Sequence, residues 1–203
     1  MIAIVDYQMG NLRSVQKAFE HVGADTILTN RIEDLKNAHR IVLPGVGAFP
    51  DAMAEINRQD LAEPLRDLIR SGKPFLGICL GLQMLFDTSY EREPTSGLGI
   101  LSGDVRQFEL PPPYKVPHMG WNRIDICHES PLLQGVPPHS YVYFVHSYYV
   151  QPADPNVVAL TACHQHDFCA AVARDNLFAT QFHPEKSQAV GLQIIRNFSR
   201  WDA

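Results

Sequence analysis

The alternation of apolar runs with amphipathic segments over residues 2–79 restricts the fold of this 203-residue chain more than any other feature. Runs typical of buried strands occur at 2–7, 24–30, 40–44 and 74–78. Segments with helical spacing lie between them at 11–22, 31–38 and 60–72. Strands that alternate with helices pair in parallel. The pattern therefore predicts an α/β fold with a doubly wound, mostly parallel sheet flanked by helices.

The pattern changes at about residue 97, where short strand-like runs separated by turn residues begin. We expect these runs to form an antiparallel β extension in the C-terminal half that covers one side of the sheet. A closing helix is expected over 187–201. The chain is 45% apolar and 19% charged, which is ordinary for a globular protein. Its length predicts a single domain over residues 1–203.

Charge and hydropathy exclude several classes of partner. The net charge is −5 and the sequence contains no run of five lysines or arginines, which argues against nucleic acid and anionic membranes. No signal-like N-terminus and no stretch of 18 apolar residues is present. The four cysteines are irregularly spaced, as expected of reduced thiols. We therefore expect a cytoplasmic protein that binds a small polar ligand or a protein partner.

Cys79 follows the predicted strand 74–78 and stands between Gly77 and Gly81 in GICLG. In the G-x-S-x-G nucleophile elbow, glycines at these positions let strand and helix pack closely while the central residue projects outwards. Amide groups at the start of a helix expected over 80–86 would favour a thiolate, and the N–H of Leu80 could hold an oxyanion. An isolated cysteine is more often a small buried hydrophobe. We expect that of the other three cysteines, whereas the flanking glycines favour a nucleophile at Cys79.

A cysteine nucleophile needs a base, and the base needs an orienting group. In QFHPEK, Pro184 favours an extended His183, so that His183 and Glu185 project to the same side. A carboxylate beside an imidazole fixes its tautomer and stabilises the imidazolium. Without Cys79, a surface His-Pro-Glu turn would be the preferred interpretation. With it, the sequence predicts a catalytic triad of Cys79, His183 and Glu185.

The segments GICLG and QFHPEK resemble those of the class I (triad-type) glutamine amidotransferases, which release ammonia from the side-chain amide of glutamine. Four further segments are DYQMGNLRSV (6–15), PGVGAF (44–49), VPHMGWN (116–122) and YFVHSYY (143–149). With them the chain is similar, over essentially its whole length, to the glutaminase subunits of imidazole glycerol phosphate synthases in histidine biosynthesis. Gln8, where the family usually has glycine, and Leu82, where methionine is common, are departures. The resemblance implies no metal and no cofactor.

The resemblance implies a mechanism of glutamine hydrolysis. The Cys79 thiolate attacks the carboxamide, and the N–H of Leu80 and one N–H from the loop at Val46 and Gly47 hold the oxyanion. His183 protonates the departing ammonia and then acts as base while water hydrolyses the glutamyl thioester. Glycines on both sides of Val46 make a peptide flip cheap. In the family, this loop completes the oxyanion hole only on activation; on its own, PGVGAF would be an ordinary strand-to-helix turn.

The same resemblance implies residues that hold the substrate. Gln83 and the segment Ser147, Tyr148 and Tyr149 are expected to bind the amino and carboxylate ends of glutamine. An aromatic-rich strand such as YVYFVHSYY is otherwise more often used for packing.

A partner subunit is implied as well. The resemblance implies a heterodimer with the TIM-barrel cyclase subunit of the same synthase. That subunit would receive ammonia through an internal tunnel and make imidazole glycerol phosphate and aminoimidazole carboxamide ribonucleotide. Trp121 is the expected anchor because Trp and Met are enriched at interface hot spots, with Asn11 and Met119 nearby. Tyr143 and Lys186 are expected at the ammonia exit. A core Trp in a short strand is the competing interpretation.

Three alternatives stay open from sequence alone. The first is a catalytically silent scaffold, against which the presence of Cys, His and Glu argues. The second is another cysteine hydrolase such as a small peptidase, against which YFVHSYY and VPHMGWN argue. The third is the amidotransferase subunit of another pathway, such as anthranilate or pyridoxal phosphate synthesis, whose members usually differ from PGVGAF and HPEKS. A zinc site in CHQHDFC (163–169) is disfavoured because four ligands on one predicted hairpin turn would be geometrically awkward.

Overall fold

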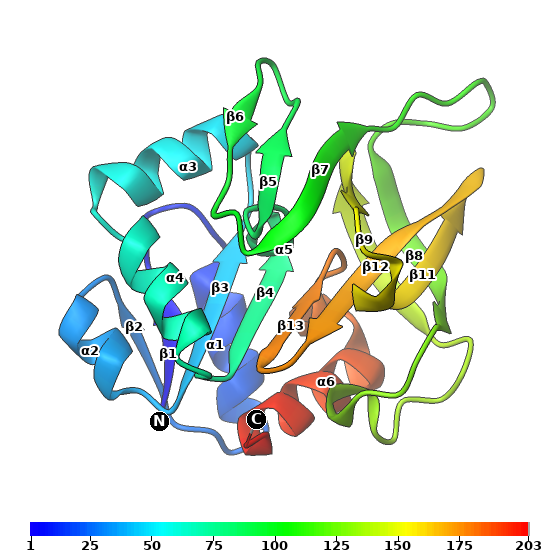
Figure 1. Ribbon diagram of the computed structural model, residues 1–203. Coiled ribbons are helices and arrows are strands. Elements are labelled where there is room, and N and C mark those ends of the chain that lie inside the picture. Colours follow the sequence, from blue (N-terminus) through cyan, green and yellow to red (C-terminus); the bar gives the residue numbers. More distant parts are fainter. Residues whose placement is uncertain (203) are drawn as a thin grey trace.

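The computed structural model describes residues 1–202, and its largest feature is a nine-stranded mixed sheet (Figure 1). In spatial order the strands are β2 (Thr26–Thr29), β1 (Ile2–Val5), β3 (Arg40–Gly45), β4 (Phe75–Cys79), β13 (Leu177–Thr180), β12 (His166–Arg174), β11 (Val158–His164), β8 (His118–Ile126) and β9 (Tyr141–His146). The strands from β2 to β13 are parallel. The strands from β12 to β9 pair antiparallel. The predicted α/β fold, with a parallel core and an antiparallel extension, is confirmed.

The antiparallel strands are placed differently from the expectation. They continue the sheet beyond β13 instead of covering one of its sides, and β13 itself pairs in parallel with β4. Asn176 explains this arrangement. Its side chain donates to the carbonyl oxygens of Ile69 and Lys73, and its own carbonyl accepts from the N–H of Phe75. Because these bonds hold the start of β13 beside the start of β4, the two strands run in the same direction.

Helices cover both faces of the parallel strands. They are α1 (Leu12–His21), α2 (Ile32–Asn37), α3 (Phe49–Arg58), α4 (Ala62–Arg70), α5 (Leu80–Gln83) and α6 (Gln188–Arg200), with 3-10 turns η1 (Pro131–Leu133), η2 (Pro155–Val157) and η3 (Pro184–Lys186). Helices α1 and α6 share a buried cluster with Ile2 and Ile4 of β1, and α2, α3 and α4 share another with Ala3 and Val5. Because successive residues of a strand face opposite sides, the two clusters lie on opposite faces of the sheet.

Two helices differ from the sequence interpretation. Helix α3 was not predicted, although its buried residues Phe49, Ala52, Met53 and Ile56 have helical spacing. The helix expected over 80–86 ends at Gln83. The reason is that the next residues pair with another part of the chain. The carbonyl of Met84 accepts from the N–H of Leu98, and the carbonyl of Leu85 accepts from two later N–H groups.

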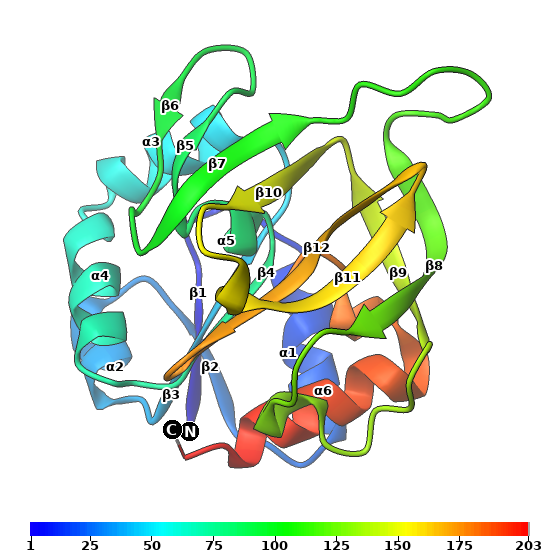
Figure 2. The same cartoon turned by 45° about the vertical axis from the view of Figure 1, so that its right-hand side comes forward.

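A second sheet follows α5. It consists of β10 (Tyr148–Pro152), β7 (Leu101–Gln107), β5 (Phe86–Ser89) and β6 (Thr95–Ser96). Both views place this sheet beyond the carboxyl ends of β3 and β4 (Figures 1 and 2). Ligands of open α/β sheets bind outside these strand ends. The second sheet therefore supplies the wall opposite Cys79, the last residue of β4.

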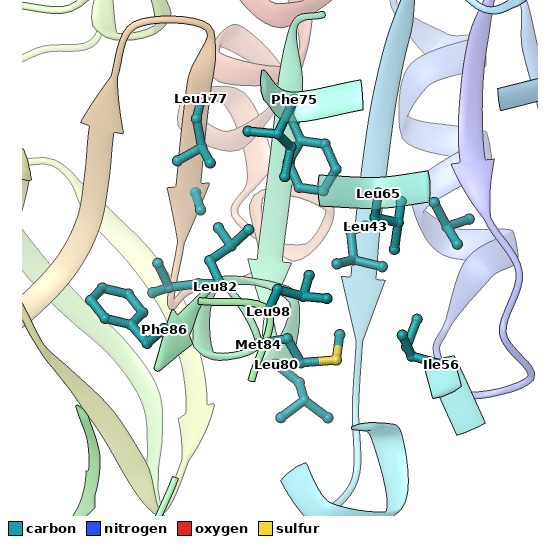
Figure 3. Close-up of a cluster of buried hydrophobic side chains, with 14 of the residues drawn as sticks. Leu43, Ile56, Leu65, Phe75, Leu80, Leu82, Met84, Phe86, Leu98 and Leu177 are labelled. Carbon is teal, nitrogen blue, oxygen red and sulfur yellow. The ribbon is translucent and has the colours of Figure 1, made fainter. Parts of the chain in front are cut away.

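The turn that carries Cys79 is anchored in the hydrophobic core. Figure 3 shows Leu80, Leu82 and Met84 among the side chains of Leu43 and Leu98, in the cluster that lies under the turn. These five side chains are at most 3% exposed. Interiors are packed as densely as organic crystals, so the backbone on both sides of the cysteine is held by the core.

The CHQHDFC segment forms the expected hairpin, in which β11 and β12 pair antiparallel on either side of Gln165. Over residues 1–202, no group of three or more His, Cys, Asp or Glu side chains is arranged to hold a metal ion. Within the same residues, no helix combines the length and the apolar character needed to cross a membrane.

Candidate active site

Cys79 occupies a strained turn between β4 and α5. Its backbone has φ 56° and ψ −108°, and α5 begins at the next residue. Such a conformation costs about 1–3 kcal/mol for a residue with a side chain. Both flanking glycines are required by close approaches. A Cβ atom on Gly81 would lie 1.9 Å from the carbonyl oxygen of Leu43, and one on Gly77 would lie 2.9 Å from the Cβ of Ala179. The turn therefore has the geometry expected of a nucleophile elbow.

His183 and Glu185 form a buried pair. The Nδ1 of His183 donates to Oε1 of Glu185 at 2.8 Å, and their side chains are 3% and 1% exposed. The backbone N–H of His183 donates to the carbonyl of Tyr143 at 3.0 Å. Ser187 Oγ donates to the carbonyl of His183 at 2.7 Å and accepts from the N–H of Tyr143 at 3.0 Å. The imidazole is thus fixed against β9 with its Nε2 left for proton exchange.

The electrostatics of His183 favour its protonated form. Burial opposes the charge, but the neighbouring Cys79 sulfur and the Glu185 carboxylate together raise the pKa of His183 to about 10. Its Nε2 is buried and has no hydrogen-bond partner in the part of the chain that the structure describes. A thiol and an imidazolium-forming base in one site can exchange a proton.

Cys79 and His183 open into one cavity of about 460 Å³. The cavity is lined by Val46, Gly47, Cys79, Leu80, Gln83, Glu91, Pro117, Val145, His146, Ser147, Tyr148 and His183. The predicted oxyanion residues Val46, Gly47 and Leu80 are thus brought together with the nucleophile. Of the predicted glutamine-binding residues, Gln83, Ser147 and Tyr148 line the cavity.

Tyr149 is not brought to this cavity. Its ring stacks on Phe108 with 4.5 Å between the ring centroids. The reason is the alternation of side chains along β10, which turns Tyr148 and Tyr149 to opposite faces.

The loop after β3 reaches over the nucleophile. Val46 is 39% exposed and Gly47 has φ 99°, a conformation that favours glycine. Gly45 could not carry a side chain, because its Cβ would lie 2.5 Å from the hydroxyl of Tyr7. The N–H of Phe49, at the start of α3, donates to Glu91 Oε2 at 2.7 Å. The loop is therefore packed tightly at Gly45 and held at Phe49, while Gly47 gives the backbone between them conformational freedom.

Two polar residues of the site were missed by the sequence interpretation. Glu91 contributes a carboxylate to the cavity, and no motif around it indicates that role. Gln181 is fully buried, and its Nε2 lies 3.8 Å from Cys79 Sγ. Its position directly after β13 was the available signal, because residues that follow neighbouring parallel strands meet at one edge of the sheet.

Four of the five predicted interface residues lie close together. Met119 and Trp121 are 63% and 46% exposed on β8, so Trp121 is not a core residue. The rings of Trp121 and Tyr143 meet edge to face at 6.1 Å, and Lys186 Nζ lies 5.8 Å from the ring centroid of Tyr143. Asn11 is the N-cap of α1, where its side chain makes no capping hydrogen bond, and α1 contacts η3, the turn that contains Lys186.

Gln8 departs from the usual glycine and has φ 69°, so a side chain occupies a left-handed backbone position. Its N–H donates to Asp6 Oδ1 at 3.0 Å, which supports the turn locally.

A nucleophile elbow that shares a cavity with a buried His–Glu pair at the strand ends defines a class of protein with a Cys-His-Glu triad. Comparison with known families identifies which family of this class the chain belongs to. The family model "Glutamine amidotransferase class-I" matches residues 3–200, so the chain belongs to this family. The solved structure of PurLQS from Thermotoga maritima has a TM-score of 0.77 at 19% identity, covering 97% of this chain and 96% of that one. At such low identity, the likeness concerns the fold alone.

Closer relatives identify the branch of the family. The chain is 58% identical to the imidazole glycerol phosphate synthase subunit HisH of Rhodopirellula baltica, over 98% of this chain and 97% of the relative. It is 54% identical to the subunit of the same name in Thermosynechococcus vestitus, over 97% and 95%. The chain therefore belongs with the HisH subunits, and the resemblance drawn from its motifs is confirmed.

Proposed function

We propose that this HisH-type chain, acting as one domain over residues 1–203, hydrolyses glutamine to glutamate and ammonia and delivers the ammonia to a TIM-barrel cyclase subunit. That partner would use it to make imidazole glycerol phosphate and aminoimidazole carboxamide ribonucleotide. The observation that carries the proposal is the strained Cys79 in one cavity with the His183–Glu185 pair. A scaffold subunit would have no use for a strained cysteine or for a buried carboxylate beside a histidine.

The first chemical step forms a thioester. The Cys79 sulfur attacks the side-chain carbonyl carbon of glutamine, and the carbonyl π electrons move to oxygen. We assign the oxyanion to the N–H of Leu80, which starts α5, and to an N–H from the loop at Val46 and Gly47; all three residues line the cavity. His183 Nε2 gives its proton to the amide nitrogen, the carbon–nitrogen bond breaks, and ammonia leaves.

The second step restores the enzyme. His183, now neutral, takes a proton from water, whose oxygen attacks the thioester carbonyl. The carbon–sulfur bond breaks, glutamate forms, and the proton on His183 again faces the thiolate of Cys79. Glu185 accepts from Nδ1 throughout, which keeps Nε2 as the nitrogen that exchanges protons.

The cavity suits the polar ends of glutamine. Glu91 is the one Asp or Glu side chain among the residues that line it, and we assign it to the ammonium group of the substrate. Both N–H groups of Gln83 Nε2 are occupied, by the carbonyl of Tyr148 at 3.0 Å and by Gln181 Oε1 at 3.1 Å. This leaves the oxygen of Gln83, which lines the cavity, as the acceptor that we assign to the substrate. Ser147 and Tyr148, on the opposite wall, are assigned to the carboxylate end.

The proposed partner surface adjoins the catalytic histidine. We assign Met119, Trp121, Tyr143 and Lys186 to this surface, together with Asn11 at the start of α1. The backbone of Tyr143 is hydrogen-bonded to His183. Exposed Trp and Met side chains are typical anchors of an interface. A subunit bound there would lie next to the atom that releases ammonia, and it could bias the conformation of the loop at Val46.

Trapping the intermediate tests the proposed chemistry. The complex with the cyclase subunit is mixed with radiolabelled glutamine, quenched in acid within milliseconds, and digested for peptide mapping. We expect label on the peptide that contains Cys79, none in Cys79→Ala, and wild-type labelling in the matched variant Cys127→Ala, which removes an exposed thiol. A chain that is never labelled and releases no glutamate would support the scaffold alternative. Label on another residue would exclude Cys79 as the nucleophile.

A further inference from the structure

Gln181 is a buried polar residue beside the nucleophile, and the steps above give it no role. It follows β13 directly. Because Thr180 pairs with Ile78 across the parallel strands, the next residues along the two strands are Gln181 and Cys79. The side chain is 0% exposed, and its Nε2 lies 3.8 Å from Cys79 Sγ. Its backbone N–H donates to the carbonyl of Ala170 at 2.8 Å. Gln181 is therefore fixed behind the sulfur.

The orientation of the Gln181 amide follows from its neighbours. The carbonyl oxygen of Tyr148 can only accept, so the Gln83 atom 3.0 Å from it is the N–H-bearing Nε2. The same Nε2 lies 3.1 Å from Gln181, so the Gln181 atom that faces it is the acceptor Oε1. Gln181 consequently turns its Nε2 toward Cys79 and can only donate to the sulfur.

Two histidines hold the start of this chain of hydrogen bonds. His146 Nδ1 lies 2.8 Å from the Tyr148 carbonyl and must donate to it. Burial lowers the pKa of His146 to about 3, so the ring is neutral and its Nε2 accepts from His118 Nδ1 at 2.9 Å. A reversed Gln181 amide would set its N–H groups against those of Gln83. This buried chain of hydrogen bonds therefore keeps the N–H donor of Gln181 directed at the Cys79 sulfur.

We propose that Gln181 is a positioning residue that holds the Cys79 sulfur as a thiolate, aimed into the cavity, through an N–H donor locked by Gln83. A thiolate accepts a hydrogen bond better than a thiol does, so the contact favours the reactive form. Hydrogen bonds to charged groups correspond to a factor of about 10 or more. Gln181 lies behind the nucleophile, so its loss changes the reactivity of the sulfur. The effect on turnover rests on the proposed glutaminase function, whereas the effect on the sulfur does not.

Alkylation of Cys79 tests this role independently of glutaminase activity. The full chain in complex with the cyclase subunit is treated with iodoacetamide across a range of pH, and modification of the Cys79 peptide is followed by mass spectrometry. The exposed Cys127 serves in the same samples as a reference for intact surface chemistry. The variants are Gln181→Met, which keeps the volume without a donor, and Gln181→Glu, which keeps an acceptor for Gln83. Thr180→Val is the matched control, because it removes the neighbouring buried hydrogen bond to the carbonyl of Phe182.

The proposal predicts that Gln181→Met slows alkylation of Cys79 about tenfold at neutral pH and displaces its pH profile upwards. Gln181→Glu should slow it further, because a carboxylate faces the sulfur. Thr180→Val should alkylate Cys79 as wild type does. In glutamine hydrolysis, kcat should fall about tenfold in Gln181→Met. Folded variants with wild-type alkylation rates and pH profiles would overturn the proposal. Wild-type protein without glutaminase activity but with this alkylation pattern would instead contradict the proposed function.

Discussion

Replacing Glu185 by glutamine perturbs the proposed triad with little change of shape. The carboxylate is 1% exposed and accepts from His183 Nδ1 at 2.8 Å, so its charge acts on the imidazole without much screening. A hydrogen bond to a charged partner contributes about 1.5–3 kcal/mol. At about 1.4 kcal/mol per pKa unit, its loss lowers the pKa of His183 by about 1–2 units. The imidazolium is less stable by the same free energy, so kcat should fall by about 10- to 100-fold.

Two assays test this prediction. Titration of 13C-labelled histidine by NMR gives the pKa of His183, whose signal is assigned by its absence in His183→Asn. Glutamate release by the complex with the cyclase subunit gives kcat and KM. Glu93→Gln, which removes an exposed carboxylate outside the cavity, is the control and should match wild type. A Glu185→Gln protein with kcat within twofold of wild type and an unchanged His183 titration would refute the role given to Glu185.

Three further substitutions follow from the packing and charge of the site. Gly81→Ala places a Cβ 1.9 Å from the Leu43 carbonyl, so the free energy of unfolding, measured with urea, should fall by about 3 kcal/mol or more; a variant as stable as wild type would contradict the close approach. Tyr7→Phe removes a fully buried hydroxyl that has no hydrogen-bond partner within residues 1–202, and should raise the free energy of unfolding by about 1 kcal/mol; a less stable variant would indicate an interaction of that hydroxyl. Glu91→Gln removes the carboxylate assigned to the substrate ammonium, so KM for glutamine should rise about tenfold with a smaller change in kcat; an unchanged KM would assign the ammonium elsewhere.

The pH dependence of stability also follows from His183. Its pKa of about 10 in the folded protein lies above the value of about 6.5 in an unfolded chain. The folded state therefore binds the proton more tightly. The resulting stabilisation is fully present below about pH 6.5 and is lost as the pH rises to about 10. His183→Asn should flatten this part of the profile of unfolding free energy against pH, and a profile identical to wild type would contradict the assignment.

Local sequence patterns were sufficient to predict most of the fold and the residues at the centre of the site. The strand–helix alternation, the glycines around Cys79 and the spacing of His183 and Glu185 each follow from backbone geometry within a few residues. Tyr149 was predicted to bind glutamine although a rule of the same kind argues against it. The alternation of side chains along a strand already separates it from Tyr148, and in the structure it stacks on Phe108.

Other parts of the site depend on contacts that local patterns do not encode. Glu91 reaches the cavity because β5 and its following turn fold back toward the start of α3, where it accepts from the N–H of Phe49. Helix α5 stops after Gln83 because the carbonyls of Met84 and Leu85 bond to residues 98–101. Gln181 meets Cys79 because β13 pairs with β4, about a hundred residues earlier in the chain. These are long-range pairings, which tertiary structure decides.

The most direct test of the account is glutamate release from glutamine by wild type and Cys79→Ala, each alone and in complex with the cyclase subunit and its nucleotide. We predict strong activity of the wild-type complex, weak activity of the isolated chain, and none in Cys79→Ala under either condition. Robust activity without the partner would contradict the gating assigned to the loop at Val46. A wild-type complex that releases no glutamate would contradict the central claim.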